Sequence, residues 1–187
     1  INFFVCNPNG DIQPEMYNCL ITGNFSYEGG GFRLDESHVT AHNITVAGNG
    51  KIGIYVQGNS SVLNFVNGII FNHDYSQEYW DDPYESGIIA GGGSGSSPTI
   101  NISYSLIKDG QNSILLFNES ILNWGEGNID YAPLFVDAEN GDYHLSDYSP
   151  AIGSGTSIGA QNTDIEGNLR PNPAGSNPDM GAYENSL

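Results

Sequence analysis

A short apolar motif recurs along the chain and constrains its fold more than any other feature. Its copies begin at residues 18, 43, 67 and 104, so successive starts lie 25, 24 and 37 residues apart. Their sequences are NCLITGN, NITVAGN, NGIIFNH and, more weakly, YSLIKDG. Self-similarity at such a spacing is typical of chains that stack one structural unit on the next.

Two further short segments accompany each copy of the motif. PEMY, VTAH, LNFV and INIS precede the copies, and GFRL, GIYV, GIIA and SILL follow them. These segments are apolar on alternate residues and are bounded by Gly, Asn or Ser, which is the pattern of short strands between turns. Three short strands per repeat predict one turn of a parallel β-helix, in which each strand pairs with its counterpart one turn away.

We therefore predict an all-β chain folded as a parallel β-helix, a solenoid of about four to five turns. Residues 1–131 should form the turns, with a loop insertion at 73–86, and residues 132–187 should form an irregular C-terminal cap of the same domain that closes the last turn. A β-sandwich of short strands is the alternative, but it explains the strands and not the repeat.

The alternation also predicts which side chains point inward. Equivalent positions in successive turns lie roughly 4.8 Å apart, so each inward position should form a stack along the solenoid. The expected stacks are Ile21, Val46, Ile70 and Ile107; Cys19, Ile44, Gly68 and Ser105; Met16, Ala41, Phe65 and Ile102; and Phe32, Ile54, Ile88 and Ile114.

Some outward positions next to these stacks are apolar as well. They include Leu20, Ile69, Leu106 and Phe71. We expect this face to be covered by a loop or by a partner. Asn24 and Asn49 both end the first strand of a repeat, where Asn tolerates left-handed backbone and can bond its neighbour in a ladder.

The charge of the chain excludes two classes of partner. It has 22 acidic and 4 basic residues, which gives a net charge of −18. Such a surface repels phosphates and anionic lipids, so we expect no nucleic-acid partner. No stretch approaches the ~20 apolar residues that span a bilayer, so we expect no membrane insertion.

The only two cysteines and the five Asn-x-Ser/Thr triplets leave alternatives open. Cys6 and Cys19 could form a disulfide in an exported protein, or they could be two buried free thiols. The triplets could carry glycans in a eukaryotic secreted protein, or they could arise by chance in an Asn- and Ser-rich chain. They lie at Asn24, Asn43, Asn59, Asn101 and Asn118.

The C-terminal part carries a more specific pattern. It reads APLFVDAENGDYHLSDYSPAIGSG, then DIEGNLRP, then PDMGAYE. This ending resembles that of right-handed parallel β-helix proteins of the pectate-lyase-like superfamily, of the bacterial secreted and surface type. The resemblance implies export to the cell surface or the extracellular space. It implies no single activity, because the family includes lyases, hydrolases and adhesins. Gly153 and Ala132 stand where the pattern usually has Asp, which puts in doubt any ion that those carboxylates would bind.

The residues give little support for catalysis by this chain alone. A polysaccharide lyase needs a base and a cation beside a uronic acid, but the strand register places no two basic residues on adjacent turns of one face. A glycoside hydrolase needs two facing carboxylates, and no acidic ladder follows the outward positions of the first strand. DAENGD, at 137–142, misses the calcium-loop pattern by one residue, which favours an Asn-Gly turn.

The insertion holds the densest chemistry in the chain. Aromatic rings there could stack on sugar rings, and carboxylates could bond hydroxyl groups or a Ca²⁺ ion, which is the only candidate cofactor. Alternatively, the insertion is a lid that folds its aromatic rings onto Ile69 and Phe71. The candidate glycan contacts are Tyr79, Trp80, Asp81, Asp82, Tyr84 and Glu85.

We therefore expect an exported, non-catalytic β-helix domain of a larger surface or secreted protein, acting as a scaffold, an adhesin or a glycan-binding module. Its expected partners are a polysaccharide or cell-surface glycan and earlier turns, or another domain, of the same polypeptide. INFFV alternates like the second strand of a turn that lacks its first strand, which favours such upstream turns. The alternative is the C-terminal fragment of a polysaccharide lyase or glycoside hydrolase whose catalytic turns lie upstream.

Overall fold

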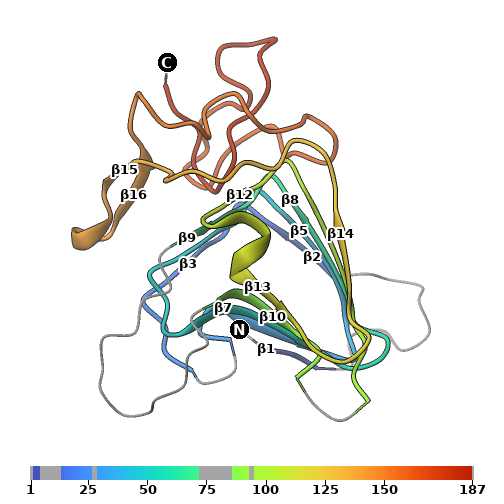
Figure 1. Ribbon diagram of the computed structural model, residues 1–187. Helices are drawn as coiled ribbons and strands as arrows, with labels where there is room; N and C mark the ends of the chain where they lie inside the picture. The colour runs from blue at the N-terminus through green and yellow to red at the C-terminus, as the bar shows by residue number, and fades with distance from the viewer. Residues whose placement is uncertain (1, 5–13, 27–28, 72–85, 93–94, 187) are drawn as a thin grey trace.

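The computed structural model describes residues 2–4, 14–26, 29–71, 86–92 and 95–186. Within these ranges the chain is a parallel β-solenoid of four turns, seen along its axis in Figure 1. Each turn crosses three sheets in the same order, which we name I, II and III. Every strand in these sheets pairs in parallel with its counterpart one turn away. The predicted fold class is confirmed.

The three sheets are built from strands that recur once per turn. Sheet I consists of β2 (Glu15–Tyr17), β5 (His38–His42), β8 (Val62–Val66), β11 (Thr99–Ser103) and β14 (Ile121–Trp124). Sheet II consists of β3 (Leu20–Thr22), β6 (Thr45–Ala47), β9 (Ile69–Phe71) and β12 (Leu106–Ile107). Sheet III consists of β1 (Asn2–Phe4), β4 (Phe32–Asp35), β7 (Ile52–Gln57), β10 (Ser86–Ala90) and β13 (Ile114–Leu116).

Two short helices and one hairpin complete the secondary structure of the described residues. The 3-10 helix η1 (Gly110–Ser113) links β12 to β13. Outside the three sheets, β15 (Phe135–Asp137) and β16 (Asp142–Leu145) pair in antiparallel fashion around the 3-10 helix η2 (Ala138–Asn140). None of the described helices is long and apolar enough to cross a membrane.

The predicted inward stacks form the core of the solenoid. In sheet II, Val46 pairs with both Ile21 and Ile70, and Ile70 pairs with Ile107. The stacks that begin at Met16 and Phe32 are also in register, because Met16 pairs with Ala41 and Phe32 pairs with Ile54. Both stacks lie in the same cluster of buried side chains. Cys19 packs at the edge of that cluster as a half-buried free thiol. Cys6 lies outside the described residues.

Asparagine shapes two corners of the turn. Between sheets I and II, Asn18, Asn43 and Asn67 all adopt positive φ, at 49°, 53° and 55°. At the other end of sheet II, Asn24 Nδ2 donates to Asn49 Oδ1 over 3.0 Å, as the expected ladder requires. The left-handed residue there is instead the preceding glycine, Gly23 or Gly48, since glycine adopts positive φ at no steric cost.

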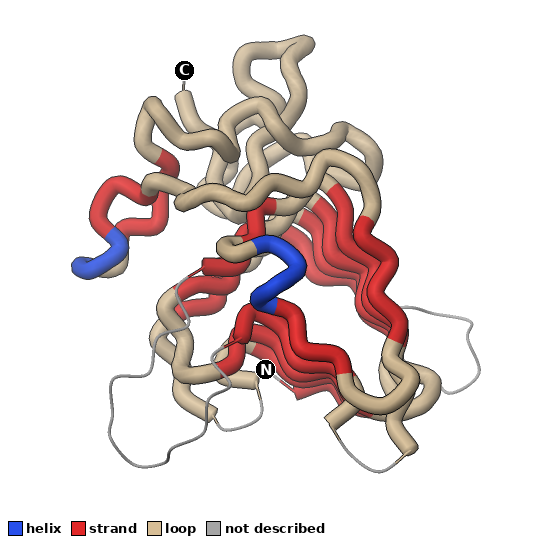
Figure 2. The backbone as a smooth tube through the Cα atoms, viewed as in Figure 1, coloured by secondary structure: helices blue, strands red, loops and turns tan. Residues whose placement is uncertain are grey.

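The outward face of sheet II is covered, as its apolar residues predict. Ile69 and Leu106 are fully buried beneath Leu145, Ala151 and Met180. The cover is therefore the C-terminal segment, by which we mean residues 132–186. This segment lies along the corner between sheets I and II, in orange and red in Figure 1 and mostly as irregular loops in Figure 2.

The C-terminal segment does not pack as the expected cap over the last turn. Its one hairpin strand on the C-terminal side, β16, pairs with β15 and not with a turn of the solenoid. The segment instead bonds to the first three turns through corner asparagines. Each of these asparagines donates from Nδ2 to a backbone carbonyl oxygen of the segment. The bonds run from Asn18 to Thr163 (2.7 Å), from Asn43 to Asp179 (3.0 Å) and from Asn67 to Thr156 (2.7 Å).

Candidate functional site

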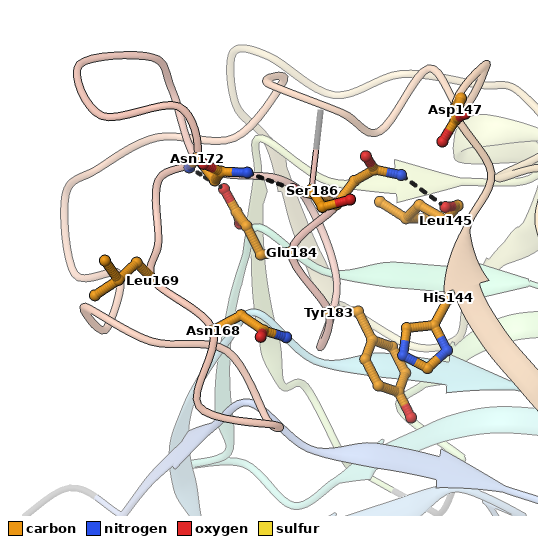
Figure 3. Close-up of a pocket in the computed structure, with 10 residues that line it drawn as sticks. His144, Leu145, Asp147, Asn168, Leu169, Asn172, Tyr183, Glu184 and Ser186 are labelled. Carbon is orange, nitrogen blue, oxygen red and sulfur yellow. Dashed lines mark hydrogen bonds between the residues drawn. The ribbon is translucent and has the colours of Figure 1, made fainter.

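A pocket of about 530 Å³ opens in the C-terminal segment, between β16 and the last described residues (Figure 3). Its volume falls within the roughly 300–1,000 Å³ that is typical of small-molecule sites. The lining contains two rings, three amide side chains, an exposed carboxylate and two apolar side chains, which are His144, Tyr183, Asn168, Asn172, Asn185, Asp147, Leu145 and Leu169.

The two rings contact each other at one side of the pocket. The centroids of His144 and Tyr183 lie 4.0 Å apart, with the rings tilted by 36°. His144 is held from both edges, because Nδ1 lies 2.6 Å from Asp142 Oδ1 and Nε2 lies 3.2 Å from Glu166 Oε2. The imidazole therefore has a fixed orientation and joins the hairpin to the loop that carries Glu166.

The surrounding carboxylates shift the pKa of both rings. Burial alone would lower the pKa of His144, but the bonds and charges of Asp142 and Glu166 outweigh it and raise the pKa. The pKa of Tyr183 is raised by burial and then by the charges of Glu166, Asp142 and Asp164. In return, the bond from His144 holds the pKa of Asp142 below its ordinary value.

The amide side chains at the pocket are fixed by bonds within the segment. Asn185 Nδ2 donates to the carbonyl oxygen of Leu145 over 2.9 Å, and Asn172 Nδ2 donates to that of Asn185 over 3.1 Å. Asn168 Nδ2 donates to Asp164 Oδ2 over 3.1 Å. The lining is therefore ordered by the protein itself.

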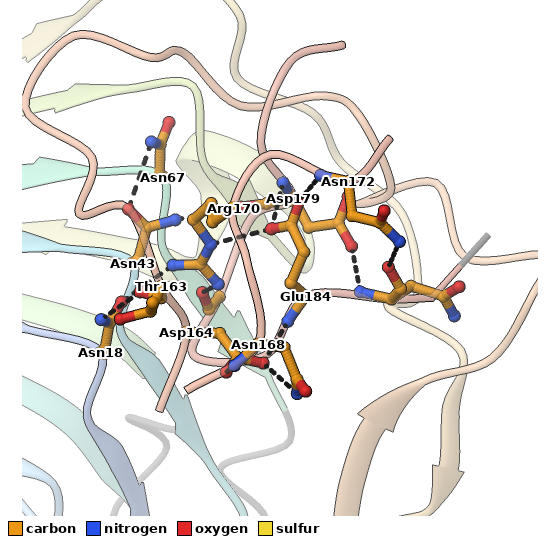
Figure 4. Close-up of polar contacts among 12 residues, drawn as sticks. Asn18, Asn43, Asn67, Thr163, Asp164, Asn168, Arg170, Asn172, Asp179 and Glu184 are labelled. Atoms are coloured by element: carbon orange, nitrogen blue, oxygen red, sulfur yellow. Dashed lines mark hydrogen bonds and ion pairs between the residues drawn. The ribbon is translucent and has the colours of Figure 1, made fainter. Parts of the chain in front are cut away.

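A buried ion pair joins Arg170 to Glu184, which is one of the residues that line the pocket (Figure 4). Arg170 Nε donates to Glu184 Oε2 over 2.8 Å, and Nη1 donates to Asn18 Oδ1 over the same distance. Arg170 Nη2 donates to the carbonyl oxygen of Gly181 over 3.1 Å. Glu184 Oε1 in turn accepts the backbone N–H of Asn172 over 2.9 Å. This network attaches one wall of the pocket to the first turn of the solenoid.

Two buried aspartates in the same region have opposite pKa shifts. Burial acts to raise the pKa of Asp164, but bonds from the backbone N–H groups of Glu184, Asn168 and Glu166 and from the Asn168 amide outweigh it and lower the pKa. Burial raises the pKa of Asp179 to about 6, and the nearby charge of Glu184 adds to the shift.

The site predicted from the sequence lies elsewhere. Tyr79, Trp80, Asp81, Asp82, Tyr84 and Glu85 all fall outside the described residues, so their role as glycan contacts stays a prediction. The face for which the insertion was a candidate lid is covered at Ile69 by the C-terminal segment.

Other sequence expectations can be compared with the described residues. Gly141 adopts φ 87° after η2, so DAENGD forms the expected turn, in which Asn140 Nδ2 donates to Asp137 Oδ2 over 2.7 Å. Among the described residues, no three His, Cys, Asp or Glu side chains gather as they would around a metal ion. The Ca²⁺ ion expected at the insertion stays a prediction.

Sequence reasoning missed the pocket and gave His144 no role. One signal was present, because Asp142 and His144 are two residues apart and so share one side of a strand. The contacts of His144 with Glu166 and Tyr183 depend on the irregular path of the C-terminal segment, which no periodicity describes.

A second polar surface runs along sheet I. Asn123 Nδ2 donates to Asn101 Oδ1 and Asn101 Nδ2 donates to Asn64 Oδ1, both over 2.7 Å. Asn64 Nδ2 then donates to Thr40 Oγ1 over 3.1 Å. These four outward side chains form a ladder across four turns, and such ladders stabilise stacked strands.

Comparisons with family models, with curated proteins and with solved structures find no match to this chain.

Proposed function

We propose that this chain is an exported, non-catalytic β-helix domain of a larger surface or secreted protein, and that it binds glycans through the pocket of the C-terminal segment. One observation carries the binding proposal. A pocket of about 530 Å³ combines the rings of His144 and Tyr183 with amide side chains held by the protein.

The chemistry of a sugar fits this combination. A pyranose has an apolar C–H face that packs on an aromatic ring, and hydroxyl groups that both donate and accept hydrogen bonds. Amide side chains offer both a donor and an acceptor, and carboxylates accept from hydroxyls. Because the lining is already ordered, a ligand would lose little affinity to the ordering of side chains.

The remaining parts of the proposal rest on the sequence. Export and membership of a larger surface or secreted protein are supported by the resemblance of the C-terminal motif to the bacterial β-helix proteins. The insertion at 73–86 would add a second glycan contact through Trp80 and its neighbours.

The experiment is glycan-array screening followed by calorimetry on the best ligand. Tyr183→Ala should weaken binding at least tenfold, whereas Tyr148→Ala should not, because Tyr148 is 88% exposed and does not line the pocket. Leu169→Trp is a second test, because Leu169 lines the pocket and is 76% exposed. The larger tryptophan side chain should block the pocket without disturbing the core.

The outcomes separate the parts of the proposal. Unchanged binding in both pocket variants would overturn the pocket as the glycan site. Unchanged binding in Trp80→Ala would remove the insertion from it. Degradation of pectin, alginate or a neutral glycan by this chain alone would replace the non-catalytic proposal with the hydrolase or lyase alternative.

A further inference from the structure

We propose that the pocket selects glycans that carry a free amine, such as oligomers of glucosamine, over N-acetylated and uronic acid glycans. This inference deepens the proposed function and rests on it.

Three solvent-accessible carboxylates lie at or beside the pocket. Asp147 lines it and is exposed. Asp142 and Glu166 meet at His144, and their side chains are 42% and 52% exposed. His144 is the only titratable cation among the described lining residues. The pocket therefore has an excess of negative charge at neutral pH.

The nearest arginine cannot compensate for this charge toward a ligand. Arg170 has no exposed side-chain surface, and it already donates to Glu184, Asn18 and Gly181. The other described cations lie on the solenoid, where Arg33 is in β4, Lys51 is buried before β7, and Lys108 lies 5.8 Å from the ring of Phe71. A ligand carboxylate would thus meet acceptors, and the one cation among the described lining residues, His144, is already engaged by Asp142 and Glu166.

The ring of Tyr183 is suited to an ammonium group. Three carboxylates, Glu166, Asp142 and Asp164, act together with burial to raise its pKa, so the potential at this ring favours positive charge. An ammonium over an aromatic face is also attracted by the ring itself. An N-acetyl group offers neither interaction, and a uronic acid carboxylate is repelled.

The test is calorimetry of the intact chain with tetramers of glucosamine, N-acetylglucosamine and galacturonic acid, at one pH below the pKa of the amine. The glucosamine tetramer should bind at least tenfold more tightly than the N-acetylated one, and the galacturonic acid tetramer should not bind. The preference should shrink in high salt, because exposed charges are screened.

Charge-neutralising variants separate a local preference from the net charge of −18. Asp147→Asn and Glu166→Gln should each reduce the preference for the amine several-fold. Glu139→Gln is the matched control, because it removes the same charge from an exposed residue of η2 that does not line the pocket.

Each outcome has a distinct meaning. Equal affinity for the amine and N-acetyl tetramers would overturn the selectivity and leave glycan binding intact. If Glu139→Gln and Asp147→Asn reduce the preference for the amine equally, the preference comes from the net charge of the whole surface. That result would overturn the local preference. Binding of neutral glycans on the array without any response to the pocket variants would overturn both proposals.

Discussion

Arg170 and Glu184 form an ion pair that is closed to solvent, with 2.8 Å between Nε and Oε2 and side-chain exposures of 0% and 1%. The guanidinium also reaches Asn18 in the first turn, 152 residues earlier in the chain. A single side chain thus joins the C-terminal segment to the start of the described solenoid.

Arg170→Met should destabilise the fold strongly, by about 3–5 kcal/mol, because it leaves the carboxylate of Glu184 buried without its partner. Urea denaturation at neutral pH measures the effect. Lys108→Met is the matched control, since Lys108 is exposed and its loss should cost less than about 1 kcal/mol. Similar midpoints for the two variants would contradict a structural role for the pair.

Asn67 should contribute to stability through both its side chain and its backbone. Its Oδ1 accepts the N–H of Thr156 and its Nδ2 donates to the carbonyl oxygen of Thr156, at 2.8 and 2.7 Å, while its φ is 55°. Asn67→Ala should lower the free energy of unfolding by about 2–4 kcal/mol, because it removes the two side-chain bonds and puts an alanine in strained left-handed backbone. Asn67→Gly removes the same bonds without that strain, so it should be more stable than Asn67→Ala by about 1 kcal/mol.

The two Asn67 variants should also loosen the C-terminal segment. Hydrogen exchange of the backbone amides near Thr156 and Gly181 should speed up in both, because Gly181 donates its N–H to the Asn67 carbonyl oxygen. Unchanged exchange there would show that the segment is held in place without this corner.

Asp179 should make the protein less stable as the pH rises from about 4 to 6. Burial raises its pKa from an ordinary 3.8 to about 6, so in this window the folded state holds a proton that the unfolded state has released. The contribution is most favourable below pH 3.8 and is lost above about pH 6, and the shift corresponds to on the order of 3 kcal/mol.

Asp179→Asn should remove that pH dependence. The variant also loses an acceptor, because Asp179 accepts the N–H groups of Gly153 and Asn185, each over 2.7 Å. The informative quantity is the change in unfolding free energy between pH 4.5 and 7, which should be smaller than in the original chain. Asp147→Asn, at an exposed position, should leave that change unaltered, and an equal change in all three proteins would refute the assignment.

His144 should titrate above the ordinary histidine value of 6.5, because Asp142 and Glu166 together outweigh its burial. Its charged form then stabilises the fold below pH 6.5, and this contribution is lost as the pH rises through the folded pKa. NMR titration of the imidazole measures the value directly. Glu166→Gln should lower it, and an unchanged value in that variant would contradict the part assigned to Glu166.

The solenoid was predictable because its information is periodic. The alternation in NITVAGN and its neighbours places Val46 inward, and the repeat places Ile21 and Ile70 beside it. The apolar outward residues Ile69 and Leu106 even predicted that their face is covered. These inferences need only the two-residue period of a strand and the stacking of turns.

The pocket was not predictable in the same way. Its walls come from residues 144–147, 168–172 and 183–186, which meet through an irregular backbone. The position of Arg170 in the sequence shows that it lies in the C-terminal segment, but not that its guanidinium reaches Asn18. Contacts of that kind depend on the path of a loop, and neither local propensity nor alternation encodes that path.

The C-terminal segment changes how this solenoid should come apart. Stacked turns usually contact only their neighbours, so they can unfold piecewise from an end. Here one segment bonds to Asn18, Asn43 and Asn67 in three successive turns and packs on Leu106 in the fourth. Opening any of these turns also removes part of the segment's support, so the four turns should melt cooperatively, as a single unit.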